Sequence, residues 1–434
     1  MSQSPEWRTT ARVVRRLGFG ATGAEVDAAL ATGIDAYIAG VLSASPATDP
    51  GVKATPPPRF ATVATLARAA STTQRKAANT ELSGQLAELT VWWLHRMVAV
   101  HRPAGEKLTF LWHNHFATSA DKVRDASSML GQNEKLRSMG LGGFRPLAYA
   151  MLTDPAMLRW LDGASNVKGS PNENLSREFM ELFALGHGNG YTETDVREGA
   201  RALTGWRPTR NGGAMLKTSA HDTGTKTVLG VTGDLDAAGF CDAVLGHPGS
   251  AGYVTSRMWQ QLASDTPPDV ATSSRLTAAY GADRNLRALM TAVLTDPSFA
   301  GARSVVSPVE WVVGAMRALT PIVDHRRLTT AASTLRTLGQ LPFYPPSVGG
   351  WPAGQAWLST AGAETRWTTA MRLAATAQNT TIVDAPPTDR IDAAAHLLGI
   401  GAFTDRTVAV LRPTTRDPVT LTAIALNSPE YLTS

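Results

Sequence analysis

Cysteine is nearly absent from this chain of 434 residues, in which Cys241 is the only one. A single thiol cannot form a disulfide bond within the chain, and it excludes a cysteine-rich metal site. Long apolar runs are missing too, because no stretch reaches the roughly 18 uninterrupted apolar residues that a membrane-spanning helix needs. The N-terminal segment also lacks the continuous apolar stretch of a secretion signal. We therefore expect a cytoplasmic protein as the chain stands, or an exported one if a signal was removed from it.

A strong excess of either charge is also lacking. The chain has 41 Lys and Arg residues against 36 Asp and Glu residues, which gives a formal net charge of +5. No dense run of Lys and Arg accompanies this mild excess, so we expect no nucleic-acid partner. Hydrophobic residues make up 43% of the chain and charged residues 18%, which is typical of a globular protein. The expected partner is a small molecule or a peptide, and the sequence identifies no partner protein.

Apolar residues recur at spacings of three and four, and alternating β-branched runs are scarce. This periodicity predicts amphipathic helices. The sequence therefore favours a mainly α-helical fold, a compact multi-helix array with long loops rich in Gly and Pro and at most short strands near residues 207–230. The clearest helices are predicted at Glu81–Met97, Glu106–Phe116, Asp283–Leu294, Pro308–Leu319, Glu364–Ala377 and Asp392–Leu398.

Three similar segments punctuate this helical pattern: "AMLTDPAML" (150–158), "AVLTDPSFA" (292–300) and "IALNSPEYL" (424–432). Each joins the end of a helical run to an Asp-Pro or Ser-Pro step. Proline disfavours a helical conformation in the residue before it, so each step predicts a helix stop followed by a new start. Residues 44–59 are rich in proline and are expected to form a surface loop or linker. No firm boundary divides the chain, and we expect a single helical domain over residues 1–434.

Residues 171–206 place polar side chains where a routine helix would not. Glu178 lies inside the apolar stripe of the predicted helix, and Asn174 and Glu181 stand beside it, four positions earlier and three later. A buried carboxylate is costly unless it is paired, protonated or bound to a metal. The residues therefore allow either a functional site or a structural ion-pair network. The arginines available for such a network are Arg177, Arg197 and Arg201.

Histidines gather in two places. His113 and His115 are separated by one residue, so on a continuous helix their side chains point about 160° apart. They can bind one ion only if the helix ends or unwinds near His113. His221 and Asp222 lie in a loop rich in Gly and Thr, which continues to Lys226. Imidazole and carboxylate together suit Zn, Fe or Mn. A hydrogen-bonded core histidine is the alternative for His113 and for His115.

Common catalytic motifs are missing from the sequence. It has no H-E-x-x-H zinc motif, no phosphate-binding P-loop and no G-x-S-x-G nucleophile elbow. The segment "GFGATG" at residues 18–23 does not lie between a predicted strand and a helix, so dinucleotide binding is not expected. Any catalytic chemistry must therefore come from the polar residues described above.

Several segments combine distinctive residue types in a fixed order along nearly the whole chain. They are "RRLGFGAT", "EKLTFLWHNHFATS", "LDGASNVKGSPNENLSREFMELFALG", "YTETDVREGARALTGW", "HDTGTKTVLG", "PPSVGGWPAGQAWLS" and "LNSPEYL". With this set the chain resembles the bacterial family catalogued as domain of unknown function 1800. The resemblance implies no activity, as the family name states. Members of that family often carry export signals, whereas this sequence shows none.

The first functional hypothesis is a metal-dependent hydrolase or oxidoreductase with Fe, Mn or Zn at an open coordination site. Glu181 would be the general base, and Arg177 or Arg201 would stabilise developing negative charge. Glu178 could also bind the metal. A haem with an axial histidine is a less favoured cofactor. The predicted metal ligands are His113, His115, His221 and Asp222, the predicted catalytic residues are Glu178, Glu181, Arg177 and Arg201, and the predicted substrate contacts are Asn172, Asn174, Lys226 and Trp206.

The second hypothesis is a non-catalytic helical binding or scaffold protein, in which the cluster of Glu, Arg and His is an internal network. The chain has 11 tryptophans, and Trp351 and Trp357 lie in a loop rich in Pro and Gly, where they could line a recognition surface. Core packing is the alternative role for these rings. Near-stoichiometric bound metal would favour the enzyme, and its repeated absence would favour the scaffold.

Overall fold

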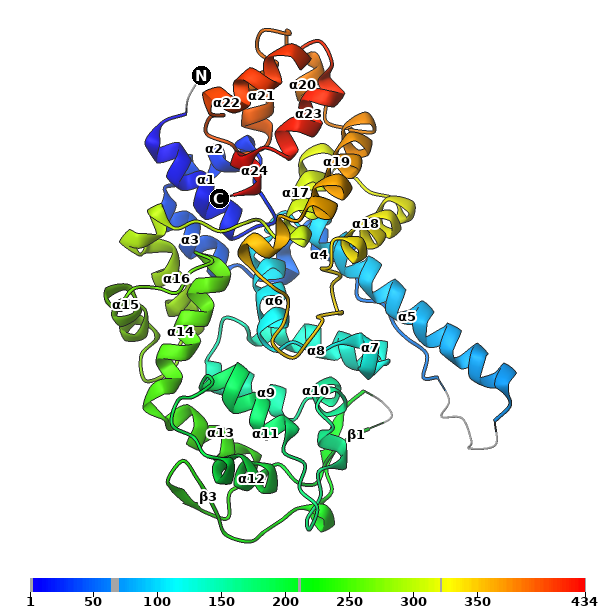
Figure 1. Cartoon of the computed structure of the whole chain (residues 1–434), viewed down its shortest axis with the longest axis vertical. Helices are drawn as coiled ribbons and strands as arrows, with labels where there is room; N and C mark the ends of the chain where they lie inside the picture. Colours follow the sequence, from blue (N-terminus) through cyan, green and yellow to red (C-terminus); the bar gives the residue numbers. More distant parts are fainter. Residues whose placement is uncertain (1–2, 64–69, 210–211, 321, 434) are drawn as a thin grey trace.

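The computed structural model describes residues 3–63, 70–209, 212–320 and 322–433. These residues form 24 α-helices, and the only strands among them are four short ones. Figure 1 shows the helices arranged around a central helix, α6 (Ala104–His115). The predicted mainly α-helical fold is confirmed.

The four strands form two antiparallel hairpins, in which β1 pairs with β2 and β3 pairs with β4. The expectation of at most short strands near residues 207–230 is therefore confirmed. Positions 210 and 211 of that segment lie outside the described residues. The elements are β1 (Trp206–Pro208), β2 (Ala214–Leu216), the 3-10 turn η4 (Thr218–Ala220), β3 (Lys226–Val228) and β4 (Val231–Gly233).

The N-terminal helices pack on one another, and α2 also packs on the C-terminal region. Side chains of Ser4 and Thr22 cap the first two helices. The Pro-rich segment 44–59 contains a 3-10 turn and a short helix, and Asp49 between them is buried. In the described residues no single helix is long and apolar enough to cross a membrane; only α2 and α3 taken together, bent by 104°, pass that test. The elements are α1 (Pro5–Arg16), α2 (Gly23–Thr32), α3 (Ile34–Ser43), η1 (Pro46–Thr48) and α4 (Pro50–Ala54).

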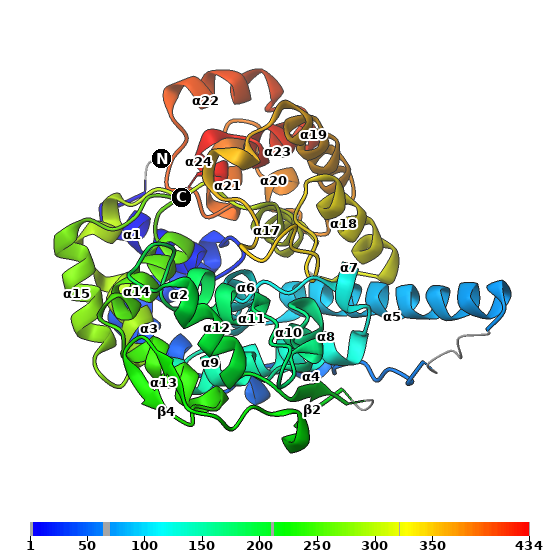
Figure 2. The ribbon, with the colours of Figure 1, turned by 60° about the horizontal axis from the view of Figure 1, so that its bottom comes forward.

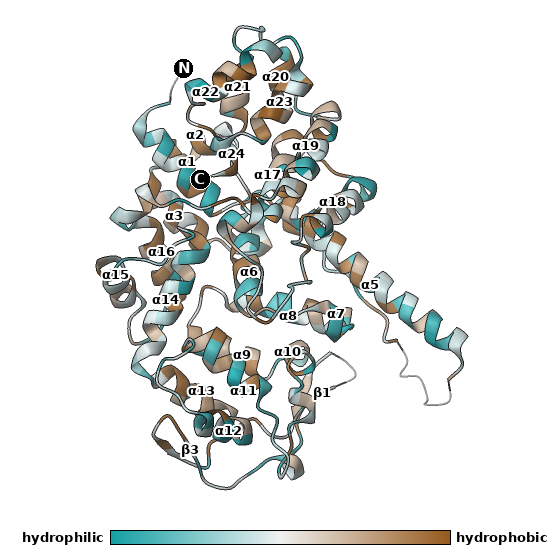
Figure 3. Cartoon of the chain, in the orientation of Figure 1, coloured by the Kyte–Doolittle hydropathy of each residue, from teal (hydrophilic) through white to brown (hydrophobic). Residues whose placement is uncertain are grey.

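Helix α5 (Thr72–Ala99) projects from the body of the molecule, as Figures 1 and 2 show from two directions. Its outer half is mostly exposed and is coloured mainly white and teal in Figure 3, because its sequence offers few apolar residues. Buried side chains begin at Gln85 and Leu86 and continue to Val98. Only the inner half of the helix therefore belongs to the core.

Buried apolar side chains form two large clusters, and α6 contributes to both. Leu108, Leu111 and Trp112 belong to the first cluster, together with residues of α8, α9 and α10. Phe110 belongs to the second, together with residues of α5, α17 and α19. Opposite faces of α6 therefore enter different cores. The elements that follow α6 are α7 (Ala120–Val123), α8 (Ala126–Met139), α9 (Phe144–Leu152), α10 (Pro155–Trp160) and η2 (Gly163–Ser165).

The helix with the carboxylates is not a regular α-helix along its whole length. It starts as α11 (Asn174–Glu178) and continues as a π-helix, η3 (Phe179–Ala184), in which Leu185 N–H donates to Met180 O five residues earlier at 3.0 Å. The wider turn rotates later side chains away from the positions of a 3.6-residue helical wheel. Helix α12 (Glu193–Ala202) starts at a capping box and ends before Gly205, as its polar start and that glycine predict.

The three Asp/Ser-Pro steps each separate two helices. Asp154, Asp296 and Ser428 accept hydrogen bonds from backbone N–H groups of the following helical segment. The predicted stops and restarts are confirmed. The remaining elements are α13 (Ala237–Gly246), α14 (Pro248–Leu262), α15 (Val270–Tyr280), α16 (Leu286–Thr295), η5 (Pro297–Gly301), α17 (Pro308–Leu319), α18 (His325–Thr337), η6 (Gly354–Trp357), α19 (Thr360–Ala375), α20 (Thr381–Asp384), α21 (Arg390–Leu397), α22 (Asp405–Leu411), η7 (Arg412–Thr414), α23 (Pro418–Leu426) and α24 (Pro429–Leu432).

Candidate functional site

The imidazole of His113 is buried in the second core. Its ring lies 5.4–5.5 Å, between centroids, from the rings of Trp93, Phe343 and Trp351. Nε2 accepts a hydrogen bond from the backbone N–H of Phe343 at 3.1 Å, so this nitrogen is unprotonated. Burial lowers the pKa of His113 to about 3. His113 is therefore a neutral core histidine that holds the loop containing Phe343.

The imidazole of His115 is buried on the other side of α6, in the first core. Nε2–H donates to the backbone carbonyl of Phe183 at 2.8 Å, and Nδ1 is buried with no hydrogen-bond partner in residues 3–63, 70–209, 212–320 and 322–433. Burial, reinforced by the charge of Arg257, lowers the pKa of His115 to about 3. This histidine fixes the π-helix against α6.

The predicted convergence of the histidines is not found. Helix α6 continues through His115, so the two imidazoles point to opposite sides, as a continuous helix requires. The backbone contacts of His113 and His115 belong to different cores, and His221 lies in a third place described below. Across the described residues, no group of three or more His, Cys, Asp or Glu side chains is placed to hold a metal ion.

Arg177 joins the carboxylates near the start of α11 into one ion-pair cluster. Its guanidinium lies 3.0 Å from Glu173, 2.7 Å from Glu193 and 3.6 Å from Glu181, measured between nitrogen and oxygen. Glu178 is half-buried, and desolvation followed by repulsion from Glu181 raises its pKa. The network that the sequence allowed as an alternative is thus present around Glu181, whereas the charge of Arg177 lowers the pKa of Glu178 less than burial and Glu181 raise it.

Glu181 also faces the glycine-rich loop that follows the π-helix. Nδ1 of His187 lies 3.4 Å from a Glu181 oxygen and 3.4 Å from the Tyr191 hydroxyl. Burial and the Glu181 carboxylate raise the pKa of Tyr191 to about 12. His187 was not among the predicted ligands, and in the structure it is an exposed partner of Glu181.

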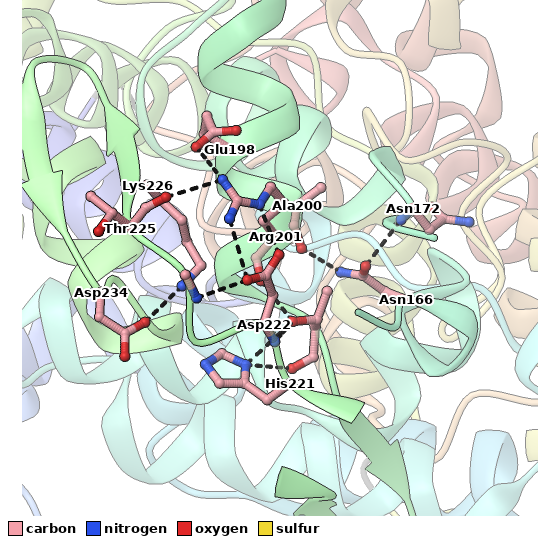
Figure 4. A network of polar contacts seen from close by, with 12 residues as sticks. Asn166, Asn172, Glu198, Ala200, Arg201, His221, Asp222, Thr225, Lys226 and Asp234 are labelled. Carbon is pink, nitrogen blue, oxygen red and sulfur yellow. Dashed lines mark hydrogen bonds and ion pairs between the residues drawn. The ribbon is translucent and has the colours of Figure 1, made fainter. Parts of the chain in front are cut away.

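Arg201 and Asp222 form the centre of a second polar cluster, drawn in Figure 4. Arg201 Nε donates to Asp222 Oδ2 at 2.8 Å, and its Nη1 donates to Glu198 at 2.7 Å. The hydrogen bond from Arg201 is the main reason why the pKa of Asp222 falls to about 2. A carboxylate held this way is already neutralised, so Arg201 is a structural partner of Asp222 in this arrangement.

His221 and Lys226 complete this cluster. Nδ1–H of His221 donates to the Thr204 carbonyl at 2.9 Å, and the Thr204 hydroxyl accepts from Asp222 N–H at 2.8 Å. The side chain of Lys226 is fully buried, and its Nζ lies 2.9 Å from Asp234. The Arg201 network is defined here as Glu198, Arg201, Thr204, His221, Asp222, Lys226 and Asp234.

The remaining predicted substrate contacts lie around this network. Asn172 N–H donates to the side chain of Asn166, whose amide in turn donates to the Ala200 carbonyl (Figure 4). Asn174 is exposed, and its amide donates to the Asp162 carboxylate at 3.3 Å. Trp206 packs against the first core. Asn172 is therefore tied through Asn166 to α12, Trp206 fills part of the core, and Asn174 contacts the residue that precedes η2.

A polar cavity of about 80 Å³ lies on one face of α6. Lys107, Leu111 and Asn114 reach it because spacings of four and three place them on the same side of the helix. The other polar walls come from the end of α1, from α14 and the residues after it, and from the first turn of α17. We name it the α6 cavity, and its polar lining includes Arg16, Lys107, Asn114, Gln261, Asp265 and Glu310.

Two buried cations line the α6 cavity. Lys107 is 4% exposed and Arg16 is 6% exposed. Lys107 Nζ forms an ion pair with Glu310, and the second oxygen of Glu310 accepts from Ser307 N–H at 2.8 Å. Burial and the charge of Arg16 lower the pKa of Lys107 to about 7. Burial and neighbouring arginines lower the pKa of Arg16 to about 9. Burial therefore disfavours the charged form of both side chains in the α6 cavity, although carboxylates of Glu310 and Asp265 also line it.

An amide donor without an acceptor also lines the α6 cavity. Gln261 Oε1 accepts from the Asn114 amide at 3.1 Å, but Gln261 Nε2 is buried and has no hydrogen-bond partner among the described residues. The side-chain oxygen of Asn114, Oδ1, accepts a hydrogen bond from the backbone N–H of Trp351 at 2.8 Å. Gly350 allows this approach, because a Cβ there would lie 2.4 Å from that oxygen. The side chains of Asn114 and Gln261 are thus fixed at the Trp351 end, and both residues line the cavity.

A family model described as "Protein of unknown function (DUF1800)" matches residues 12–433. The chain belongs to this family. No curated protein sequence matches the chain, and no solved structure matches it. Five of the seven segments that carry the family resemblance gather in two places. "RRLGFGAT", "EKLTFLWHNHFATS" and "PPSVGGWPAGQAWLS" meet at the α6 cavity, and "YTETDVREGARALTGW" and "HDTGTKTVLG" meet at the Arg201 network.

Sequence reasoning missed the residues of the α6 cavity. The spacing of Lys107 and Asn114, seven residues apart on one helix, was an available signal that the neighbouring histidines, His113 and His115, obscured. No comparable signal exists for Arg16, Gln261 and Glu310, since they come from three separate helices and meet only in the folded chain.

Proposed function

We propose that this chain is a binding protein for a small carboxylate, or a similarly oxygen-rich anion, and that the α6 cavity is its binding site. The buried Gln261 Nε2 without an acceptor carries the proposal, because an unsatisfied buried donor costs about 1–3 kcal/mol unless water or a ligand completes it. The cavity volume of about 80 Å³ exceeds the roughly 10–15 Å³ that one water molecule needs. A ligand of a few heavy atoms is therefore the matching size.

The side chains that line the α6 cavity favour a ligand that accepts hydrogen bonds over one that donates them. Asp265 already accepts from Ser304 Oγ and from Val305 N–H, each at 2.8 Å. Glu310 accepts from Ser307 N–H and faces Lys107. Lys107 Nζ has three hydrogens, and its contact with Glu310 leaves others for a ligand. A bound anion would also favour the charged form of Lys107, which burial disfavours.

Thermal unfolding of the full chain with sodium acetate tests this proposal, with acetamide as the neutral counterpart and sodium chloride to hold the ionic strength. A ligand that binds only the folded state raises the unfolding free energy by RT ln(1 + [L]/Kd), about 2.7 kcal/mol at 100 times Kd. We expect acetate to raise Tm progressively with concentration and acetamide to leave it unchanged. Gln261→Glu should abolish the acetate response, because it replaces the amide donor by a charged acceptor of the same shape.

A matched control separates this local effect from a general effect of charge. Gln378→Glu adds the same negative charge at an exposed position outside the cavity lining, and it should keep the full acetate response. Equal responses of the wild type and Gln261→Glu would show that acetate acts elsewhere and would remove the α6 cavity from the proposal.

A second candidate function is proton transfer on the bound ligand. A lysine whose pKa is about 7 is partly neutral at physiological pH and can accept a proton as a general base. Perturbed pKa values of this kind cluster at active sites. This candidate predicts a reaction whose rate rises with pH around 7 and is lost in Lys107→Met.

The metal-dependent hydrolase or oxidoreductase expected from the sequence stays a separate proposal, which does not involve the α6 cavity. The ligand geometry of the described residues lends it no support, because His113, His115 and His221 point into separate surroundings. Its test is metal analysis of protein purified without a metal-affinity tag.

A further inference from the structure

A second cavity, of about 480 Å³, lies between α17, α18 and α19, away from the residues of the α6 cavity. Its apolar floor is formed by Val312, Met316, Ala331 and Leu373, all of which are buried. This volume is within the range of roughly 300–1,000 Å³ that is common for small-molecule sites. The floor can therefore accept an apolar group of moderate size.

Three arginines surround this floor. Arg326, Arg327 and Arg372 contribute to the lining, and Asp324 is the only carboxylate in the lining that the structure describes. Asp324 already serves as the N-cap of α18, where it accepts from the backbone N–H of Arg327 at 2.8 Å. We name this pocket the three-arginine cavity. Its positive charge exceeds its negative charge.

The hydrogen bonds of these arginines are incomplete. Arg327 Nη2 reaches the Thr376 carbonyl at 3.4 Å, and Arg372 Nη2 reaches the Thr334 hydroxyl at 3.4 Å, both at the long limit for a hydrogen bond. Arg327 Nη1 is buried and has no acceptor within the part of the chain that the structure describes. Buried guanidinium nitrogens of this kind are normally completed by an anion or by water.

We propose that the three-arginine cavity binds a small phosphate monoester with an apolar substituent. Guanidinium groups present parallel N–H donors that match the oxygens of a phosphate. Phosphate fits three arginines better than a carboxylate does, because it offers three oxygens and close to two negative charges. The apolar substituent would lie on the floor formed by Val312, Met316 and Leu373. This inference is independent of the α6 cavity and of its ligand.

Isothermal titration calorimetry of the full chain with phenyl phosphate tests the proposal. Inorganic phosphate and benzyl alcohol, at the same ionic strength, separate the contributions of the two halves of the probe. We expect phenyl phosphate to bind most tightly, inorganic phosphate more weakly and benzyl alcohol not at all. Arg327→Gln and Arg372→Gln should each weaken phenyl phosphate binding roughly tenfold or more, since each removes charge-assisted hydrogen bonds.

Controls make each outcome decisive. Arg406→Gln removes an exposed arginine of α22 outside this cavity and should leave binding unchanged. Arg372 is exposed, so its variant carries the test if circular dichroism shows that Arg327→Gln is misfolded. Sedimentation with phosphatidylcholine vesicles containing phosphatidic acid distinguishes a lipid headgroup from a soluble ester. Binding to vesicles alone, equal binding of benzyl alcohol, binding that survives both cavity variants, or no binding of phenyl phosphate would each overturn the proposal.

Discussion

The Arg201 network and the α6 cavity are both polar clusters assembled from distant segments, but their charges are completed differently. In the Arg201 network, Asp222 receives hydrogen bonds from Arg201, and its pKa falls to about 2 because the charged form is stabilised. In the α6 cavity, the pKa of Lys107 falls to about 7 because its charged form is destabilised. Gln261 also has a buried donor without an acceptor there.

This difference separates a structural cluster from a candidate site. A closed set of hydrogen bonds stabilises the folded chain and leaves little for a ligand to complete. Hydrogen-bonding groups that lack partners beside a cavity lower the stability of the folded chain. A ligand that supplies the missing partners removes this cost when it binds. The sequence indicated the Arg201 network because His221 and Asp222 are typical metal ligands. The donor that lacks an acceptor lies instead at the α6 cavity.

The largest expected effect is on the ion pair of the α6 cavity, in which Lys107 is buried and Glu310 is partly buried. Glu310→Gln keeps the shape of the side chain but leaves the Lys107 ammonium uncompensated, which lowers the pKa of Lys107 further. The loss of unfolding free energy should be about 3 kcal/mol near pH 5, where Lys107 is charged, and about 1 kcal/mol near pH 8, where it is neutral. Urea unfolding at the two pH values measures both. An equal loss of unfolding free energy at both pH values would contradict the claim that the pKa of Lys107 is lowered to about 7.

The sign of the Lys107 contribution can be checked in the wild type. The pKa of Lys107 is lower in the folded chain than in the unfolded chain, so the unfolded chain binds more protons between about pH 7 and the ordinary lysine pKa. The contribution of Lys107 to stability is therefore least favourable below pH 7 and rises as the pH increases through that window.

His113 and His115 provide a further test of the difference between the two clusters. They lie on either side of Asn114 in the sequence, but they do not line the α6 cavity. Burial lowers the pKa of His113 and of His115 to about 3, so both stay neutral in the folded chain while the unfolded chain takes up protons below its ordinary histidine pKa. Stability therefore falls with decreasing pH, by about 1.4 kcal/mol per pH unit for each histidine. His113→Gln or His115→Gln should reduce that slope by this amount.

Urea unfolding between about pH 6 and pH 4 measures the slope, and His325→Gln at an exposed position is the matched control. Both α6 variants should keep the acetate response of the wild type. An unchanged slope would show that the buried imidazoles titrate normally, and a lost acetate response would move the site toward the histidines.

A smaller effect is expected in the Arg201 network. Arg201→Gln removes the charged partner of Asp222, but the pair is partly exposed, so we expect a loss of only about 1 kcal/mol near pH 7. The pKa of Asp222 is lowered in the folded chain, so this stabilisation is present above the ordinary Asp pKa and is lost as the pH falls through about 2. The exposed Arg197→Gln, one turn away, is the control. A change in acetate binding by Arg201→Gln would break the distinction between the two clusters.

The smallest expected effect is on metal content. His221 uses Nδ1 to hold the Thr204 carbonyl, and Asp222 is engaged by Arg201. We therefore expect His221→Ala to lower stability slightly and to leave the metal content of untagged protein unchanged, as measured by inductively coupled plasma mass spectrometry. Near-stoichiometric metal that disappears in His221→Ala would restore the metal-dependent hypothesis.

Much of the fold follows from local signals in the sequence. The apolar spacing in residues 106–116 and the Asp-Pro steps predicted helices and stops that the structure contains. The same helical geometry already implied that His113 and His115 diverge on a continuous helix. The π-helix at Phe179–Ala184 was not predictable, because its apolar residues fit an α-helix equally well.

The candidate site could be predicted only in part, for a physical reason. Whether a charge forms a closed network or borders a cavity depends on neighbours that come from other helices. Arg16, Gln261 and Glu310 carry no local pattern that marks them, and the partner of Lys107 is more than two hundred residues away in the sequence. Tertiary packing determines these contacts. Sequence patterns alone therefore identified residues of typical metal-ligand type and missed those that line the α6 cavity.

The pKa of Lys107 in the presence and absence of acetate tests the central claim most directly. Lysine labelled with ¹³C at Cε gives the titration by NMR, and Lys107→Arg assigns the signal. The account predicts a pKa of about 7 without acetate and a clear rise when acetate binds, because an anion beside the ammonium favours its charged form. A pKa near the ordinary lysine value, or one that acetate does not move, would contradict the claim that the α6 cavity is an open anion site.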